Sequence, residues 1–243
     1  MTEPIKINAW AQGLYETSTT KKECLGAKRI TEDGREFRYC KAGGTLIPGG
    51  ATFGPALTAH HVAQEQTSGA ANAVGATNVT VYVGATAVTA NQYDDGYLLV
   101  HRTTSGTAGM IYPISSHTTS AAGLETITVY LKEPLEVATY TTCYLSLIPN
   151  PWSSVIAAKD IATSYTGQAF VACASGSYCW VQTGGIGNTK GDNTATAANY
   201  PIGPSDTESC LEVASTQKGP VVGYAYGTAL VEGYHTPVML YSN

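Results

Sequence analysis

Two adjacent histidines and a nearby glutamate, in His60-His61-Val-Ala-Gln-Glu65, are the residues of this chain that best suit metal binding. Imidazole and carboxylate groups are common zinc ligands, and on a helix His61 and Glu65 would share one face. The segment departs from the His-Glu-x-x-His order of metalloproteases, and we identify no third ligand in the sequence. We therefore interpret it as a polar loop or a strand end, and we predict no metal site.

A glycine-rich segment, Gly184-Gly-Ile-Gly-Asn-Thr-Lys-Gly191, follows a strand-like run and superficially resembles a phosphate-binding loop. Lys190 stands where the dinucleotide-binding pattern Gly-x-Gly-x-x-Gly requires its third glycine, and the Gly-Lys-Ser/Thr of nucleotide-binding P-loops is absent. No helix-like segment follows it. We therefore predict a flexible loop.

Two neighbouring carboxylates, in Asp94-Asp95-Gly96, could serve calcium binding or acid–base catalysis. They stand between strand-like runs and are flanked by tyrosines, so the sequence favours a turn. The chain has no Gly-x-Ser-x-Gly elbow, and the surroundings of its five histidines suggest no serine partner. We expect a protein that is not an enzyme and that uses no cofactor.

None of the six cysteines forms a Cys-x-x-Cys pair, which excludes a zinc ribbon and a thioredoxin-like motif. If residues 175–177 form a three-residue hairpin loop, Cys173 and Cys179 lie opposite each other and can form a disulfide. Because cytosolic thiols usually stay reduced, we favour buried, unbridged side chains. The cysteines are at positions 24, 40, 143, 173, 179 and 210.

One basic region lies near the start of the chain, with acidic residues interleaved. The whole chain has a net charge of -5 and a pI near 5.5, whereas nucleic-acid-binding domains usually run basic. We interpret the region as an exposed hairpin of mixed charge and expect no nucleic-acid partner. Contact of the basic side chains with an acidic protein partner stays open. The basic residues are Lys21, Lys22, Lys28, Arg29, Arg35 and Arg38.

The composition predicts an all-β fold. β-Branched and aromatic residues, including 16 tyrosines, suit half-buried strands, and the 26 glycines punctuate them. Only 13% of the residues are charged, against roughly 25% in an average protein. This low charge favours a surface covered by neighbours, although a merely neutral surface fits as well. A length of 243 residues allows one large all-β domain or two small ones.

Strict alternation of apolar and polar residues marks the clearest strands. Val79, Val81 and Val83 share one face of residues 78–83, and residues 126–131 repeat the pattern. A turn or two of helix is expected only around residues 59–66. Further strands are expected at 97–100, 110–114, 143–148, 168–174, 178–183, 220–225 and 237–241.

The pair of prolines around Asn150 marks a boundary between two strand-rich blocks. We expect a β-barrel or β-sandwich body with short strands, carried by two β subdomains. The predicted parts are an extended N-terminal arm (1–24), a β-barrel-like domain closest to the capsid (25–69 and 151–243) and an inserted β domain (70–150).

Asp33-Gly34 is the strongest short-range hairpin signal in the chain. A two-residue turn would place Ile30 opposite Phe37, whereas a four-residue loop would place Arg29 opposite Glu36. The pattern predicts the hairpin and leaves these two registers open. Neither register brings Cys24 opposite Cys40.

The first ten residues contain no apolar run, so we expect no signal peptide and synthesis in a cytoplasm. No segment approaches the 18 consecutive apolar residues of a membrane-spanning helix, so we expect no membrane partner.

A series of short motifs runs in order through nearly the whole chain. It comprises Gly13-Leu-Tyr-Glu-Thr-Ser-Thr-Thr-Lys-Lys22, Leu25-Gly26, Asp33-Gly-Arg-Glu-Phe-Arg-Tyr39, Lys41-Ala-Gly43, Val83-Gly-Ala-Thr-Ala-Val-Thr-Ala-Asn-Gln-Tyr93, Leu147-Ile-Pro-Asn-Pro151, Tyr178-Cys-Trp-Val-Gln-Thr183, Pro220-Val-Val-Gly-Tyr224 and Pro237-Val238. This series resembles the virion-associated proteins of tailed bacteriophages, of the head decoration or cement type.

The resemblance implies a non-enzymatic β protein, made in the host bacterial cytoplasm, that lies as a homotrimer on the outer capsid surface of the virion. There it would reinforce contacts between subunits of the major capsid protein, and its N-terminal arm would reach the shell or a neighbouring copy. The alternative is a head fibre, spike or tail component that contacts the host surface, with aromatic residues near Trp152 or Trp180 stacking on sugars. The expected capsid or subunit contacts are Trp10, Leu14, Tyr15, Thr17, Thr19, Lys21, Lys22, Arg35 and Arg38.

Overall fold

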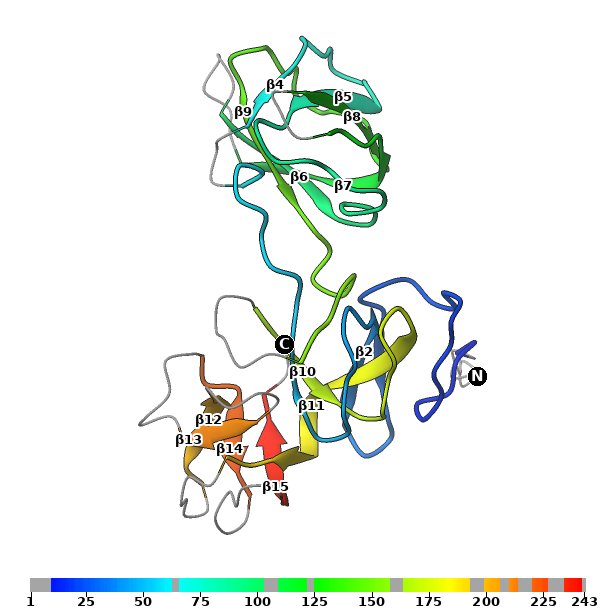
Figure 1. The fold of residues 1–243 in the computed structure, drawn as a ribbon, viewed down its shortest axis with the longest axis vertical. Helices are drawn as coiled ribbons and strands as arrows, with labels where there is room; N and C mark the ends of the chain where they lie inside the picture. Colours follow the sequence, from blue (N-terminus) through cyan, green and yellow to red (C-terminus); the bar gives the residue numbers. More distant parts are fainter. Residues whose placement is uncertain are drawn as a thin grey trace, which may run out of the picture. The chain divides into compact units, whose positions relative to one another are not determined.

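The computed structural model confirms the all-β fold: strands and no helix occur in the part of the chain that it describes (Figure 1). The described residues are 10–62, 66–102, 109–121, 125–157, 164–192, 199–205, 210–213, 220–226 and 234–241. The chain forms two compact units. One unit comprises Met1–Pro55 together with Trp152–Asn243, and the other comprises Ala56–Pro151.

The unit formed by Ala56–Pro151 is a closed antiparallel barrel with the strand order β4-β5-β8-β7-β6-β9. Its core follows the predicted alternation, since Val79 pairs with Val129 and Val81 with Ile127, and all four side chains are buried. Leu98, Val100, Leu145 and Leu147 extend this core across β6 and β9. The strands are β4 (Gln66–Ser68), β5 (Asn78–Tyr82), β6 (Tyr97–Arg102), β7 (Met110–His117), β8 (Thr126–Leu131) and β9 (Tyr144–Ile148).

The barrel unit begins at Ala56 rather than at residue 70, because β4 pairs with both β5 and β9. The closed barrel is thus the inserted unit, whereas the flanking segments form a different sheet. The helical turns expected around residues 59–66 do not occur in the described residues. Instead, the His61 main chain bonds back to Thr58 in a turn with His60 at a positive φ of 65°. Residues 63–65 lie outside the described part.

The flanking unit contains a nine-stranded antiparallel sheet with the path β1-β2-β11-β15-β14-β12-β13, and β10 pairs with β11 and β3. Its buried residues form clusters around Phe53 and Val238, around Cys40 and Val181, and around Phe37 and Trp180. The strands are β1 (Lys28–Ile30), β2 (Glu36–Lys41), β3 (Ala51–Phe53), β10 (Tyr165–Ala169), β11 (Tyr178–Lys190), β12 (Pro201–Pro204), β13 (Leu211–Val213), β14 (Gly223–Ala225) and β15 (His235–Leu240).

β11 is a 13-residue strand that joins two parts of this sheet: its first half pairs with β2 and β10, and its second half pairs with β15 (Figure 1). The prediction of a flexible loop at Gly184–Gly191 is therefore wrong. The glycines serve the bend of the strand instead of mobility. Gly185 has φ of +80°, and a Cβ on Gly187 would lie 2.7 Å from the Gln168 Oε1 atom.

The predicted hairpin at Asp33-Gly34 is confirmed, but its register is neither of the two expected. Ile30 lies opposite Glu36 and Arg29 opposite Phe37, which leaves a three-residue loop between Thr31 and Arg35. Gly34 adopts φ of +79° in this loop, a conformation that glycine accepts at little cost.

The cysteines are unbridged, and all except Cys24 are buried. Cys179 lies opposite Cys40 across β11 and β2, with the two Sγ atoms 3.7 Å apart, and it also contacts Cys173. Its hydrogen bond with Cys173 lowers the pKa of Cys179, but the bond with Cys40 and burial raise that pKa to above the ordinary value. These thiols therefore act as small buried side chains.

Candidate interaction site

The described part of the predicted arm, residues 10–24, lies against the sheet of its own unit. The Trp10 ring meets Trp180 edge-on, with 5.1 Å between ring centroids. Gln12 is buried, donates to the Tyr178 carbonyl at 3.0 Å and accepts a hydrogen bond from the Tyr39 hydroxyl at 2.7 Å. An aromatic ring and a satisfied amide therefore fasten this segment to β2 and β11.

The expected contact residues divide into buried and exposed groups. Trp10 and Leu14 pack against the cluster of Phe37, Tyr39 and Trp180. The Arg38 guanidinium donates to the Gly26 carbonyl at 2.8 Å and lies over the Trp152 ring. These three residues are engaged within the unit. The exposed members are Tyr15, Thr17, Thr19, Lys21 and Lys22, and Arg35 is half-buried.

Tyr15 and Arg35, which are 20 positions apart in the numbering, meet around one ring. The Phe170 ring lies 4.9 Å from the Tyr15 ring centroid, and the Arg35 guanidinium carbon is 5.6 Å from the Phe170 centroid. Tyr15 remains 73% exposed. The arm and the hairpin thus contribute to one surface, which we call the hairpin face: Tyr15, Ile30, Arg35 and Phe170.

The outer edge of β1 is open, since β1 pairs only with β2 among the described strands. Thr31 donates its N–H to the Arg35 carbonyl, and Ala27 accepts from the Tyr39 N–H, so alternate residues of this strand bond inward. The antiparallel pattern then directs the main-chain N–H and C=O groups of Lys28 and Ile30 outward. Ile30 is 61% exposed beside them.

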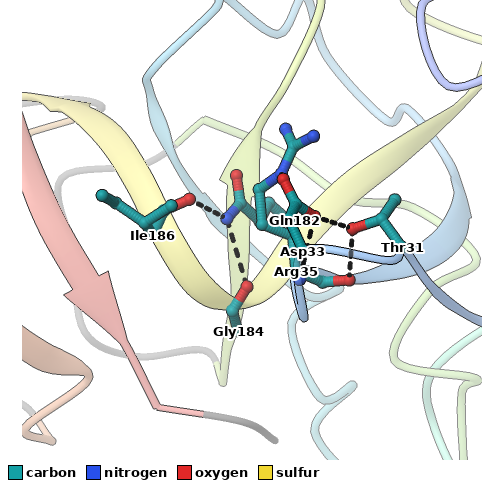
Figure 2. A network of polar contacts seen from close by, with 6 residues as sticks. All are labelled: Thr31, Asp33, Arg35, Gln182, Gly184 and Ile186. Carbon is teal, nitrogen blue, oxygen red and sulfur yellow. Dashed lines mark hydrogen bonds and ion pairs between the residues drawn. The ribbon is translucent and has the colours of Figure 1, made fainter.

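The loop of the hairpin is held by a compact polar network (Figure 2). Thr31 Oγ1 donates to the Asp33 carboxylate and lies 3.1 Å from the Arg35 carbonyl, while Arg35 Nε donates to Asp33 Oδ2 at 2.7 Å. The hydrogen bond from Thr31 is the main reason why the pKa of Asp33 is lowered. The Asp33 carboxylate therefore balances the charge of Arg35.

Gln182 and Phe170 complete this region, and the sequence gave no signal for either. The Gln182 amide nitrogen donates to the carbonyls of Gly184 and Ile186, at 3.1 and 2.7 Å (Figure 2). A lone glutamine in a strand matches no motif, and only the pairing of β11 with β2 and β10 places it near Arg35.

Comparison of the chain with protein-family models, with curated proteins and with solved structures finds no match in any of the three.

The barrel unit contains a second polar cluster, centred on the buried His61. Its Nε2 lies 3.0 Å from the Thr86 carbonyl, which can only accept, so Nε2 carries the proton and Nδ1 accepts from the Tyr93 hydroxyl at 2.5 Å. Burial lowers the pKa of His61 and raises the pKa of Tyr93 to about 12. Both ring nitrogens are thereby occupied, and the proposed partner Glu65 lies outside the described residues.

The other candidate motif of the barrel, Asp94-Asp95-Gly96, is a turn: Gly96 donates its N–H to the Tyr93 carbonyl at 2.9 Å. Asp95 forms an ion pair with Lys132 at 2.6 Å. In the described residues, no three His, Cys, Asp or Glu side chains gather as a metal site would require. That part of the chain also contains no helix long and apolar enough to span a membrane.

Proposed function

We propose that this protein is a structural decoration protein of a bacteriophage head, which binds the outer capsid surface and stabilises contacts between major capsid protein subunits. The observation that carries the proposal is the open edge of β1, with the exposed Ile30 and Tyr15 on the adjoining hairpin face. The ordered motifs that resemble head decoration proteins support the same function.

An open strand edge suits a clamp because added strands bind through main-chain hydrogen bonds that tolerate sequence variation. The edge of β1 offers Lys28 and Ile30 for this purpose. Its three-residue length and the charges of Lys28 and Arg29 limit indiscriminate pairing. On a capsid, many identical copies would bind a repeating lattice, so a modest contact at each copy suffices for stable decoration.

Heads that lack the protein provide the direct test. We expect the purified protein to cosediment with such heads and to raise the temperature at which they release DNA. Absence of both effects would contradict the proposal.

A proline at position 30 tests the edge itself. The N–H of Ile30 points away from β2, so Ile30→Pro removes an outward donor without removing a β1–β2 hydrogen bond. We expect Ile30→Pro to weaken head binding while its thermal unfolding stays close to that of the matched control Ile30→Val. Equal binding by the two variants would show that the edge is not used.

We also propose that the protein acts as a homotrimer. Mass photometry of the purified protein, and of the protein eluted from heads, measures the oligomeric state. A monomer in both samples would contradict this part of the proposal.

One observation favours the alternative role, contact with host-surface sugars, although not at the tryptophans first considered. Trp180 is fully buried and Trp152 packs beneath Arg38. Instead, the outer face of β12, β14 and β15 has a shallow hollow of about 300 Å³ lined by Asn199, Pro201, Tyr224 and Tyr241. Binding to a glycan array, lost in Tyr241→Ala and accompanied by no binding to heads, would favour this role.

A further inference from the structure

A hollow of about 460 Å³ lies between the hairpin loop and the bend of β11, within the size range of ligand pockets. It is a built cavity, because its walls come from five separate stretches of the flanking unit. Gln168 and Gln182 form part of these walls and are only 2% and 3% exposed. The residues that line it are Asp33, Arg35, Pro48, Gly49, Gln168, Ala169, Phe170, Gln182, Ile186, Gly187, Asn188 and His235.

Gln182 presents an acceptor to this hollow. Its amide nitrogen donates to two main-chain carbonyls, those of Gly184 and Ile186, so the assignment of nitrogen and oxygen in the side chain is fixed. The amide oxygen makes no hydrogen bond to the described residues, yet it is not among their sealed, unpartnered polar atoms. It therefore faces the hollow as an unpartnered but accessible acceptor.

Arg35 presents donors to the same hollow. Its Nε atom is taken by Asp33, whereas its two terminal nitrogens make no hydrogen bond to the described residues. Figure 2 shows these nitrogens and the Gln182 amide oxygen pointing to the same side of the polar network. The guanidinium is also fixed over the Phe37 and Phe170 rings, with its carbon 5.6 Å from each centroid.

The charge of the hollow favours a neutral ligand. The Asp33 carboxylate, 2.7 Å from Arg35 Nε, already balances the guanidinium, so a phosphate or carboxylate would meet an acidic group beside its binding partner. A neutral group that offers one acceptor and one donor side by side matches Arg35 and Gln182. A peptide group has this arrangement, with its C=O and N–H.

We infer that this hollow binds a main-chain peptide group in an extended, uncharged segment of the capsid shell protein, with its C=O accepting from Arg35 and its N–H donating to Gln182. The inference rests on the proposed decoration function and adds the recognised group to it. Phe170 and Ile186 would cover the apolar side chains next to that peptide group.

Head binding by variants tests the inference. Ile186 is 45% exposed and lines the hollow, so Ile186→Trp fills the hollow from a surface position, whereas Ile111→Trp places the same ring on an exposed isoleucine of the barrel. Arg35→Lys keeps the charge but loses the two terminal donors. With heads lacking the protein, we expect Ile186→Trp and Arg35→Lys to bind at least tenfold more weakly than the wild type, and Ile111→Trp to bind equally.

The outcomes separate the two proposals. Wild-type binding with undiminished binding of Ile186→Trp and Arg35→Lys overturns the inference and leaves the decoration function standing. Failure of the wild type to bind overturns both. Circular dichroism and thermal unfolding of each variant establish that a loss of binding is not a loss of folding.

A photo-crosslink identifies the occupant. Asn188 is exposed and lines the hollow, so a benzoylphenylalanine placed at position 188 would react with whatever enters it. On decorated heads, we expect mass spectrometry to find crosslinks to one segment of the shell protein that lacks charged residues. Crosslinks to a second copy of this chain, to a charged segment, or to nothing would overturn the inference.

Discussion

Gln168 on β10 and Gln182 on β11 lie opposite each other, and both direct their amide nitrogens to main-chain carbonyls at the bend of β11. Gln168 holds the carbonyls of Asn188 and Gly49, while Gln182 holds those of Gly184 and Ile186. Four carbonyls freed by the bend and the nearby turn are thus satisfied by two side chains.

The glutamine pair predicts a measurable coupling. Gln168→Leu and Gln182→Leu should each lower the free energy of unfolding by about 1–3 kcal/mol, because buried carbonyls lose their donors. Since both side chains support one bend, the double variant should deviate from additivity by about 0.5–3 kcal/mol. Urea unfolding of the wild type, both single variants and the double variant measures this. Strictly additive effects would contradict a shared role.

Gly49 should not tolerate a side chain. Its φ is +74°, and a Cβ atom there would lie 2.3 Å from His235 Cδ2 and 2.9 Å from the Asn188 carbonyl oxygen. The matched control is Gly176, with φ of +81° and nothing within 4 Å of its Cβ position. We expect Gly49→Ala to lower the free energy of unfolding by about 1–3 kcal/mol more than Gly176→Ala. Similar losses would mean that the neighbours of Gly49 can move aside.

Trp10 should fasten the N-terminal segment. Trp10→Ala removes the edge contact with Trp180 and the ring beneath Arg29, so we expect a loss of about 1–3 kcal/mol and faster proteolysis within residues 11–22. Thr17→Ala, at an exposed position of the same segment, is the control. Limited proteolysis followed by mass spectrometry locates the cuts. Unchanged cleavage would show that Gln12 alone holds the segment.

The barrel unit should lose stability in mild acid. Burial lowers the pKa of His61 below its ordinary value of 6.5, so the unfolded chain binds a proton at this position more readily than the folded one. The contribution is fully present above pH ~6.5 and falls as the pH drops below it. Urea unfolding at pH 7.5 and pH 5 should show this decrease, which His61→Gln should reduce and His60→Gln should retain.

Cysteine accessibility should differ sharply along the chain. Cys24 is exposed, whereas the other five cysteines are buried. We expect iodoacetamide to modify Cys24 rapidly in the folded protein and the others only after unfolding. Peptide mass spectrometry reads out each position. Rapid modification of Cys40 or Cys179 in the native protein would contradict the buried thiol cluster.

Predictability followed the amount of local information at each place. Thr126–Leu131 was read from its alternation alone and forms β8 with those bounds, because one buried face imposes a period of two. Gly184–Gly191 was misread because glycines occur both in loops and at tight bends, and only the contact with Gln168 distinguishes the two. The hairpin register depended on one further residue in the loop, which Gly34 supplies in a left-handed conformation.

The sequence by itself determined the all-β class, most strands and the position of the first hairpin, since alternation and turn residues act over a few neighbouring positions. The tertiary structure alone decided that the closed barrel is the inserted unit, that residues 10–24 lie on their own sheet, and that Arg35 meets Gln182. These relationships depend on pairing between strands far apart in the chain. Such pairing is set by packing and main-chain hydrogen bonds rather than by any local pattern.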